Sequence, residues 1–224
     1  MPLELHPLEE ADVPIFTDIM WESFTYDGGV MGLMYPNGYS QEAREHSMQR
    51  TLKSWRKYPD RIKKMKVIDT SLPENDKYKK IVGVADWLFY PHERTAEEIE
   101  AESAEGKEDG PPPGGDAALM QDFFGALGKV GREYHGTQPL VRLHILATLP
   151  EHHRRGVGAM QMRWGFAEAD KLGLAVWLEG SPIGTPLYKR HGFETVGWLD
   201  WDARKWGSEK DVPHAIMVRP AKKL

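Results

Sequence analysis

The stretch of sequence that decides the fold is LATLPEHHRRGVGAM, Leu146 to Met160. An apolar segment typical of a strand runs through Pro150 into two arginines and two glycines, and a helical pattern follows. Glycine lets a backbone approach a ligand closely, and the first turn of a helix leaves its N–H groups without intrahelical acceptors. Positive charge at such a turn favours an anion. The stretch therefore predicts a strand, an anion-binding turn and a helix.

Composition narrows the class of protein. The chain has 224 residues, of which 40% are hydrophobic, so we expect one domain over residues 1–224 with a core of its own. The 29 basic and 34 acidic residues give a net charge of −5, which does not indicate a nucleic-acid partner or an anionic-membrane surface. The start of the sequence is acidic, and no apolar run reaches the roughly 20 residues of a membrane span. We expect a cytoplasmic protein without a membrane partner, as a monomer or homodimer.

Several kinds of chemistry do not fit the sequence. It contains no cysteine, which excludes disulfides, cysteine nucleophiles and thiolate metal sites. His152 and His153 are adjacent and would point in different directions, and no H-E-x-x-H motif occurs, so we expect no metal site. The segment GSPIG lacks the spacing of a hydrolase nucleophile elbow, and GALGK lacks a full phosphate loop.

The N-terminal half has an alternating pattern of helices and strands. Helical periodicity follows Asp12, and a second helix begins after Ser40 and ends before Pro59; both polar residues are typical N-caps. Strands are predicted at residues 3–6, 64–70 and 81–90.

Residues 91–136 interrupt this pattern and are predicted to be an insertion, helical in part and disordered in part. An acidic helix is expected from about Thr95, followed by a turn at PPPGG. A second, better-packed helix is predicted on apolar side chains at helical spacing, namely Leu119, Phe123, Phe124 and Leu127. The insertion is either a solvated excursion on the surface or a lid over a substrate cleft.

The C-terminal half begins with a predicted central strand, LVRLHILATL at residues 140–149. Simple alternation places Arg142, His144, Leu146 and Thr148 on one face and Val141, Leu143, Ile145, Ala147 and Leu149 on the core face. A helix over 156–171, a strand over 174–181, a short helix in TPLYKRHGF and two closing strands follow. This order predicts an α+β fold.

Two separated motifs resemble the GNAT superfamily of acyl-coenzyme A-dependent N-acyltransferases. The family pattern of Arg or Gln, two residues, Gly, one residue, and Gly or Ala is similar to His153–Gly158, with His153 as the departure. The second motif is LYKRHGF, about thirty residues later. The resemblance implies a mixed, mostly antiparallel central sheet flanked by helices, with the insertion between the third and fourth strands.

The resemblance also implies a site. Backbone N–H groups of residues 154–159 and the arginine side chains would hold the diphosphate of acetyl-CoA, the backbone of residues 146–148 would hold its pantetheine arm, and Ser181 would touch that arm. The implied cofactor-binding residues are Leu146, Ala147, Thr148, His153, Arg154, Arg155, Gly156, Val157, Gly158, Ala159 and Ser181. Tyr188 would meet the departing thiolate.

The reaction so implied transfers an acetyl or other acyl group directly to a primary amine of a small molecule or protein. The amine must lose a proton, and three residues are candidates for the base: Glu179 at the end of a strand, His144 in the central strand, and Asp86 within an apolar strand. Water or a residue of the insertion is the alternative. A catalytically silent coenzyme A-binding module, acting as a sensor or scaffold, is the second hypothesis for the whole protein.

Overall fold

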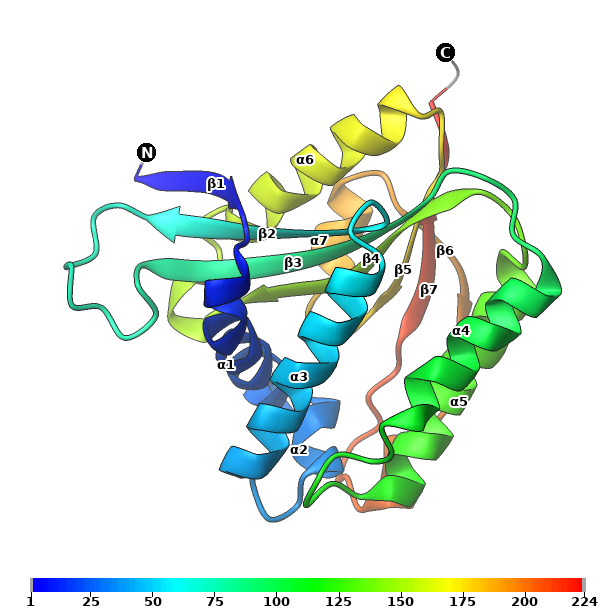
Figure 1. Cartoon of the computed structure of the whole chain (residues 1–224), viewed down its shortest axis with the longest axis horizontal. Coiled ribbons are helices and arrows are strands. Elements are labelled where there is room, and N and C mark those ends of the chain that lie inside the picture. The colour runs from blue at the N-terminus through cyan, green and yellow to red at the C-terminus, as the bar shows by residue number, and fades with distance from the viewer. Residues whose placement is uncertain (1, 223–224) are drawn as a thin grey trace.

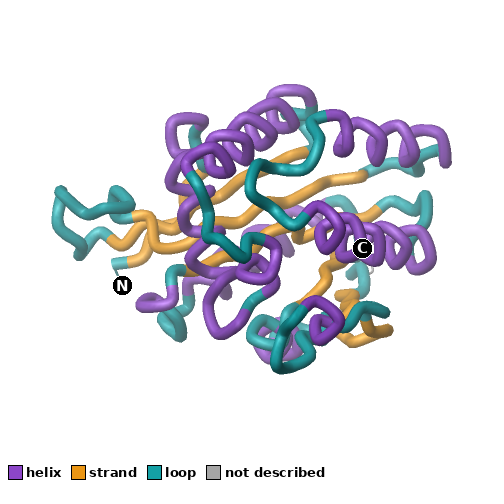
Figure 2. Tube along the Cα trace, turned by 90° about the horizontal axis from the view of Figure 1, so that it is seen from below, coloured by secondary structure: helices purple, strands orange, loops and turns teal. Residues whose placement is uncertain are grey.

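A seven-stranded sheet runs through the centre of the protein, with helices on both faces (Figures 1 and 2). This computed structural model describes residues 2–222, and the backbone alone at 105–108. The strand order is β1-β2-β3-β4-β5-β7-β6, and among the described strand pairs only β4 and β5 run parallel. The strands are β1 (Leu3–Pro7), β2 (Ile62–Asp69), β3 (Ile81–Tyr90), β4 (Leu140–Thr148), β5 (Val176–Gly180), β6 (Glu194–Trp198) and β7 (Ala215–Arg219). The predicted mixed, mostly antiparallel sheet is confirmed.

The helices form two layers. Those on one face are α1 (Val13–Thr25), α2 (Val30–Met34), α3 (Gln41–Lys57) and α5 (Ala117–Tyr134), and those on the other are α6 (Val157–Lys171) and α7 (Thr185–Arg190). Helix α4 (Ala96–Glu108) lies beside the end of β3, and short 3₁₀ turns occupy Glu10–Asp12, Tyr26–Gly28, Pro150–His152 and Ala203–Trp206. No helix among residues 2–222 is long and apolar enough to cross a membrane.

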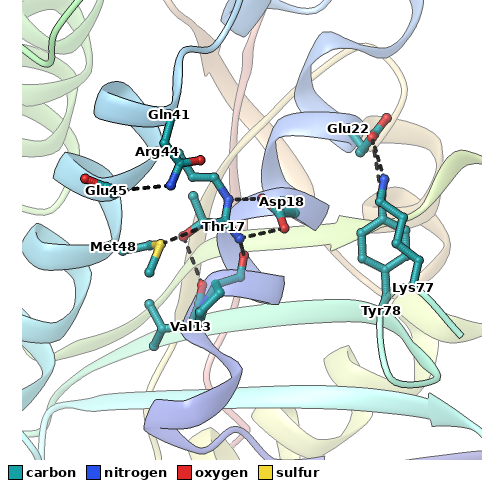
Figure 3. Close-up of polar contacts among 11 residues, drawn as sticks. Val13, Thr17, Asp18, Glu22, Gln41, Arg44, Glu45, Met48, Lys77 and Tyr78 are labelled. Carbon is teal, nitrogen blue, oxygen red and sulfur yellow. Dashed lines mark hydrogen bonds and ion pairs between the residues drawn. The ribbon is translucent and has the colours of Figure 1, made fainter. Parts of the chain in front are cut away.

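Polar contacts fix α1 against α3, as Figure 3 shows. The Arg44 guanidinium of α3 donates to both carboxylate oxygens of Asp18 in α1, at 2.6 and 2.8 Å. Ser40 caps α3 as predicted, accepting a hydrogen bond from the Ala43 N–H. Asp12 stands at the N-cap position of α1 but does not cap it, because its carboxylate accepts from the Glu9 N–H and pairs with Lys66. Helix α1 is thereby held over the sheet.

The sheet opens between β4 and β5. Strand β4 pairs with β3 along its whole length, from Leu140 to Thr148. With β5 it pairs only at its start, through Val141 and Arg142. Because the β5 residues beyond Trp177 pair with β7 alone, the second half of β4 has no strand partner on its β5 side within residues 2–222.

A bulge at His144 reverses the faces of β4. Asp86 of β3 lies opposite Ile145 and Trp87 lies opposite Leu143, so His144 has no counterpart. One extra residue exchanges the two faces of a strand beyond it, since side chains alternate with a period of two. The predicted faces are therefore wrong beyond His144: Leu146 packs with Val141 and Leu143, under α6, and Ile145, Ala147 and Leu149 pack under α1.

The insertion lies between β3 and β4, as predicted, and contains helices α4 and α5 with a non-helical connection at residues 109–116. Helix α4 begins at Ala96, where the Thr95 hydroxyl accepts from the Glu98 N–H. Helix α5 is part of the core, with Leu119, Met120, Phe123 and Val130 buried. The predicted better-packed second helix is thus confirmed, and the alternative of a solvated excursion is wrong for α5. The prediction that Phe124 packs is also wrong, since Phe124 is 56% exposed.

Candidate functional site

The turn between β4 and α6 presents a row of backbone N–H groups without protein acceptors. Arg154 has φ +63° and Gly156 has φ +91°, while Arg155 between them lies outside the left-handed region. Of the N–H groups near the start of α6, that of Met160 is the first to find a backbone acceptor, the Gly156 carbonyl at 2.9 Å. For the preceding N–H groups, at residues 154–159, residues 2–222 provide no acceptor. Alternating backbone of this kind at a helix start forms an anion-binding concavity.

The two arginines of the turn have different surroundings. The Arg155 Nη2 atom lies 2.5 Å from the Asp69 carboxylate, which is almost fully buried and also accepts from the Ser71 hydroxyl and N–H. Burial acts to raise the pKa of Asp69, but these hydrogen bonds hold it below its usual value. Arg154 is exposed and contacts no acidic side chain of the described chain. Of the two arginines, Arg154 is therefore the one without an acidic partner in the described chain.

His153, the departure from the family pattern, faces back toward β4. Its Nε2–H donates to the Thr148 carbonyl at 3.0 Å, and the Ser23 hydroxyl of α1 donates to the same oxygen at 2.9 Å. The Tyr26 ring meets the His153 ring edge to face, with centroids 5.4 Å apart. The Thr148 carbonyl, within the stretch predicted to hold a pantetheine arm, thus already has two protein donors.

Close packing explains the second glycine of the motif. A Cβ atom at Gly158 would lie 3.0 Å from Leu187 Cδ2 and 3.6 Å from Leu146 Cδ2. A side chain at residue 158 would therefore press on Leu187, where the first turn of α6 lies against α7.

His144 is accessible at the centre of the sheet. Strands β3, β4 and β5 are described in full, and among their residues His144 alone is exposed. Its Nδ1 lies 3.2 Å from Asp86 Oδ2, which Lys64 Nζ also contacts at 2.7 Å. Burial acts to raise the pKa of Asp86, but the charges of Lys64 and His144 hold it below its usual value. A carboxylate at this position accepts the Nδ1–H, which leaves Nε2 as the basic nitrogen of neutral His144. Sequence spacing alone did not connect these residues.

Glu179 is held in a partly buried ion pair with Arg142. Its carboxylate accepts from Arg142 Nη2 at 3.0 and 3.1 Å and from Trp177 Nε1 at 3.0 Å. Burial acts to raise the pKa of Glu179, but Arg142 and the Trp177 N–H hold it below its usual value. A carboxylate so stabilised is a weak proton acceptor and a good counter-ion.

Tyr188 and Ser181 shape the turn between β5 and α7. The Tyr188 ring packs against Phe193, with centroids 5.9 Å apart, and its burial raises the pKa of the phenol. A Cβ atom at Gly184 would lie 2.7 Å from this ring. The Ser181 hydroxyl accepts from the Gly184 N–H at 3.3 Å. Within the part of the chain that the structure describes, no three or more His, Cys, Asp or Glu side chains form a group that could hold a metal ion.

The fold is known from solved structures, although the sequence matches no model of a known protein family and no curated protein. Histone acetyltransferase HPA2 and related acetyltransferase from Corynebacterium glutamicum is 20% identical, with a TM-score of 0.60 over 100% of this chain and 99% of that chain. Arylalkylamine N-acetyltransferase 2 from Aedes aegypti is 10% identical, with a TM-score of 0.66 over 99% and 100%. PaiA N-acetyltransferase from Thermoplasma acidophilum, solved with coenzyme A, is 13% identical, with a TM-score of 0.50 over 98% and 99%.

These likenesses span the whole chain. The protein has the fold of the GCN5-related N-acetyltransferases, the GNAT fold, as the two motifs indicated.

Proposed function

We propose that this protein is an N-acetyltransferase that transfers the acetyl group of acetyl-CoA to a primary amine. The observation that carries the proposal is the row of N–H groups at residues 154–159, which have no protein acceptor and lie beside Arg154 on a GNAT fold. A diphosphate needs several N–H donors and some positive charge, and this turn provides both. The residues present therefore fit coenzyme A.

The opening of the sheet between β4 and β5 leaves room for the pantetheine arm and acetyl group of the cosubstrate. An arm that begins at the turn can follow the second half of β4, from Thr148 back toward His144, where no strand pairs on the β5 side. Backbone groups of Leu146 and Ala147 are the proposed contacts, in the manner of a peptide that adds to a sheet edge. The acyl end of such an arm lies near the accessible His144.

We assign the base to His144. The amine nitrogen attacks the thioester carbonyl and forms the new C–N bond, and His144 Nε2 accepts the amine proton. The C–S bond breaks, the departing thiolate takes a proton from water, and His144 returns its proton to the hydroxide so formed, which leaves coenzyme A as its thiol. Asp86 positions the imidazole through Nδ1, and Lys64 keeps Asp86 ionised. Glu179 is less suited to the base, because Arg142 and Trp177 stabilise its charged form.

Tyr188 is the proposed partner of the leaving sulfur. Burial raises the pKa of its phenol, so complete proton transfer to the thiolate is even less favourable than for an ordinary tyrosine, whose pKa is about 1.5 units above that of a thiol. A hydrogen bond from the Tyr188 hydroxyl to the developing thiolate does not require that transfer, and the proton reaches the sulfur from water.

The test begins with coenzyme A alone. At about 100 times its Kd it should add roughly 2.7 kcal/mol to the free energy of unfolding and raise the melting temperature by about 5–11 °C. Release of free thiol from acetyl-CoA should then be measured with a panel of amines. Arylalkylamines and peptides with free N-termini come first, because similar structures are named for an arylalkylamine and for ribosomal-protein alanine.

The outcomes separate the hypotheses. If millimolar coenzyme A does not shift the melting temperature, the assignment of acetyl-CoA as the cosubstrate is refuted. A shift without thiol release for any amine would favour a coenzyme A-binding module without turnover. Thiol release with a mass increase of one acetyl group on the amine would establish the reaction.

A further inference from the structure

A cavity lies far from the β4–α6 turn, and we call it the α4–α6 cavity. Its volume is about 770 Å³, within the range of small-molecule sites. It is lined by the end of β3, by α4 and by the C-terminal part of α6. Tyr90 in its wall pairs with Leu140 at the start of β4, whereas the turn follows Thr148 at the other end, roughly 26 Å along the strand at about 3.3 Å per residue. Coenzyme A at the turn does not account for this cavity.

The inner wall of the cavity contains a cluster of two arginines and a tyrosine that binds a carboxylate. Arg61 and Arg94 both lie over the Tyr90 ring, 5.3 and 3.8 Å from its centroid. The Glu102 carboxylate of α4 lies between them, 3.1 Å from Arg61 Nη2, 3.4 Å from Arg94 Nη1 and 3.1 Å from the Tyr90 hydroxyl. The Nε atoms of both arginines are buried and find no hydrogen-bond partner among the residues that the structure describes. Two guanidinium groups on one ring repel each other unless an anion lies between them.

The helix that provides this carboxylate is weakly anchored. Among its side chains at residues 96–104, only Ile99 and Glu102 are partly buried, and the others are exposed. A helix that buries so little apolar surface gains little stability from packing. The contacts of Glu102 are therefore a large part of what holds this part of α4 to the sheet, and a free carboxylate can compete for them.

Apolar side chains complete the cavity. Phe89, Trp164 and Leu172 line it beside the arginine cluster. They offer contact to an organic body and none to a bare inorganic anion.

We propose that the α4–α6 cavity is a second ligand site, which binds a small organic acid with an aromatic or aliphatic body. Its carboxylate replaces that of Glu102 between Arg61 and Arg94, and its body lies against Phe89, Trp164 and Leu172. The site is independent of acetyl transfer.

The experiment titrates the full chain with 4-phenylbutyrate and, as a matched neutral control, 4-phenylbutanol, by isothermal calorimetry. The acid should bind at least about tenfold more tightly than the alcohol, equivalent to about 1.4 kcal/mol. Glu102→Gln keeps the shape of the side chain and removes the competing charge, so it should tighten acid binding about tenfold. Arg94→Met should weaken acid binding at least tenfold and leave the melting shift caused by coenzyme A unchanged.

Equal affinity for acid and alcohol, or unchanged acid affinity in Arg94→Met, would overturn the proposal. So would the absence of acid binding to Glu102→Gln at millimolar concentration. If Arg94→Met does not fold, hydrogen exchange of the wild type with 4-phenylbutyrate decides: protection at residues 58–63 and 88–94 supports the site, and protection only elsewhere refutes it. If the wild-type protein does not bind coenzyme A, the proposed function is refuted, but the proposal of an organic-acid site in the α4–α6 cavity is not affected.

Discussion

Substitution of the two neighbouring arginines of the β4–α6 turn should have opposite effects. Arg154 has a left-handed backbone and an exposed side chain without an acidic partner, whereas Arg155 pairs with the buried Asp69. Arg154→Gly removes the cation and the backbone strain together. Arg155→Gln removes the cationic partner of a buried carboxylate and leaves it only the hydrogen bonds from Ser71.

The magnitudes follow from these contacts. A left-handed L-residue costs about 1–2 kcal/mol, and glycine loses about 0.5–1 kcal/mol more backbone entropy on folding, so Arg154→Gly should stabilise the free protein by about 0–1.5 kcal/mol. Coenzyme A should bind it roughly five- to tenfold more weakly, the effect of a charge-assisted hydrogen bond reduced by solvent exposure. Arg155→Gln should destabilise the fold by about 1–2 kcal/mol, the lower part of the range for a buried group that loses a partner, because the arginine side chain is 36% exposed.

The assay combines thermal melts of the free proteins with calorimetric titration of coenzyme A. Arg155→Gln should melt about 2–8 °C lower than wild type and keep its coenzyme A affinity within about twofold. Arg154→Gly should melt at or above the wild-type temperature, with the weaker binding given above. If Arg155→Gln loses more affinity for coenzyme A than Arg154→Gly does, and does not lose stability, these separate roles of the two arginines are refuted.

Three further predictions concern the acyl-transfer residues and pH. Tyr188→Phe keeps the packing and removes the hydroxyl, so kcat should fall about 10²–10⁴-fold with little change in coenzyme A affinity, and a variant that keeps more than about a third of wild-type kcat would leave Tyr188 a packing residue. Asp86→Asn should lower kcat by a similar factor and alter the pH–rate profile, because an amide can donate to His144 Nδ1 and hold the wrong tautomer; an unchanged profile contradicts the assignment. Burial lowers the pKa of His214 below its ordinary 6.5. As the pH falls, the His214 side chain is therefore protonated at a higher pH in the unfolded chain than in the folded one. The free energy of unfolding should thus fall as pH drops from about 6.5 through the folded pKa. Denaturant titrations at several pH values test this, and His214→Gln should make the dependence shallower.

Local signals in the sequence were sufficient for much of the fold. The strand, turn and helix around Arg154 and Gly156 were predictable because a left-handed backbone, a helix start and a ligand-accessible turn depend on residues that are neighbours in sequence. Ser40 and Thr95 mark helix starts for the same reason. Helix α2 was missed, since its five residues, Val30–Met34, are too few for a helical period to be read.

The arrangement of the candidate site was decided only by the tertiary structure. At the bulge, the pairing register of β3 and β4 shifts by one residue, which leaves His144 unpaired. The hydrophobic pattern of β4 alone does not show how that strand pairs with β3. That bulge lies where His144 meets Asp86, 58 residues away in sequence. The partner of Arg155, Asp69, is 86 residues away, and only the fold distinguishes that arginine from Arg154.

The sequence by itself thus determined most of the elements and the turn before α6, whose backbone requirements are local. The tertiary structure decided which side chains meet, which arginine pairs with Asp69, and where the sheet opens, because these depend on packing between segments that are distant in the chain.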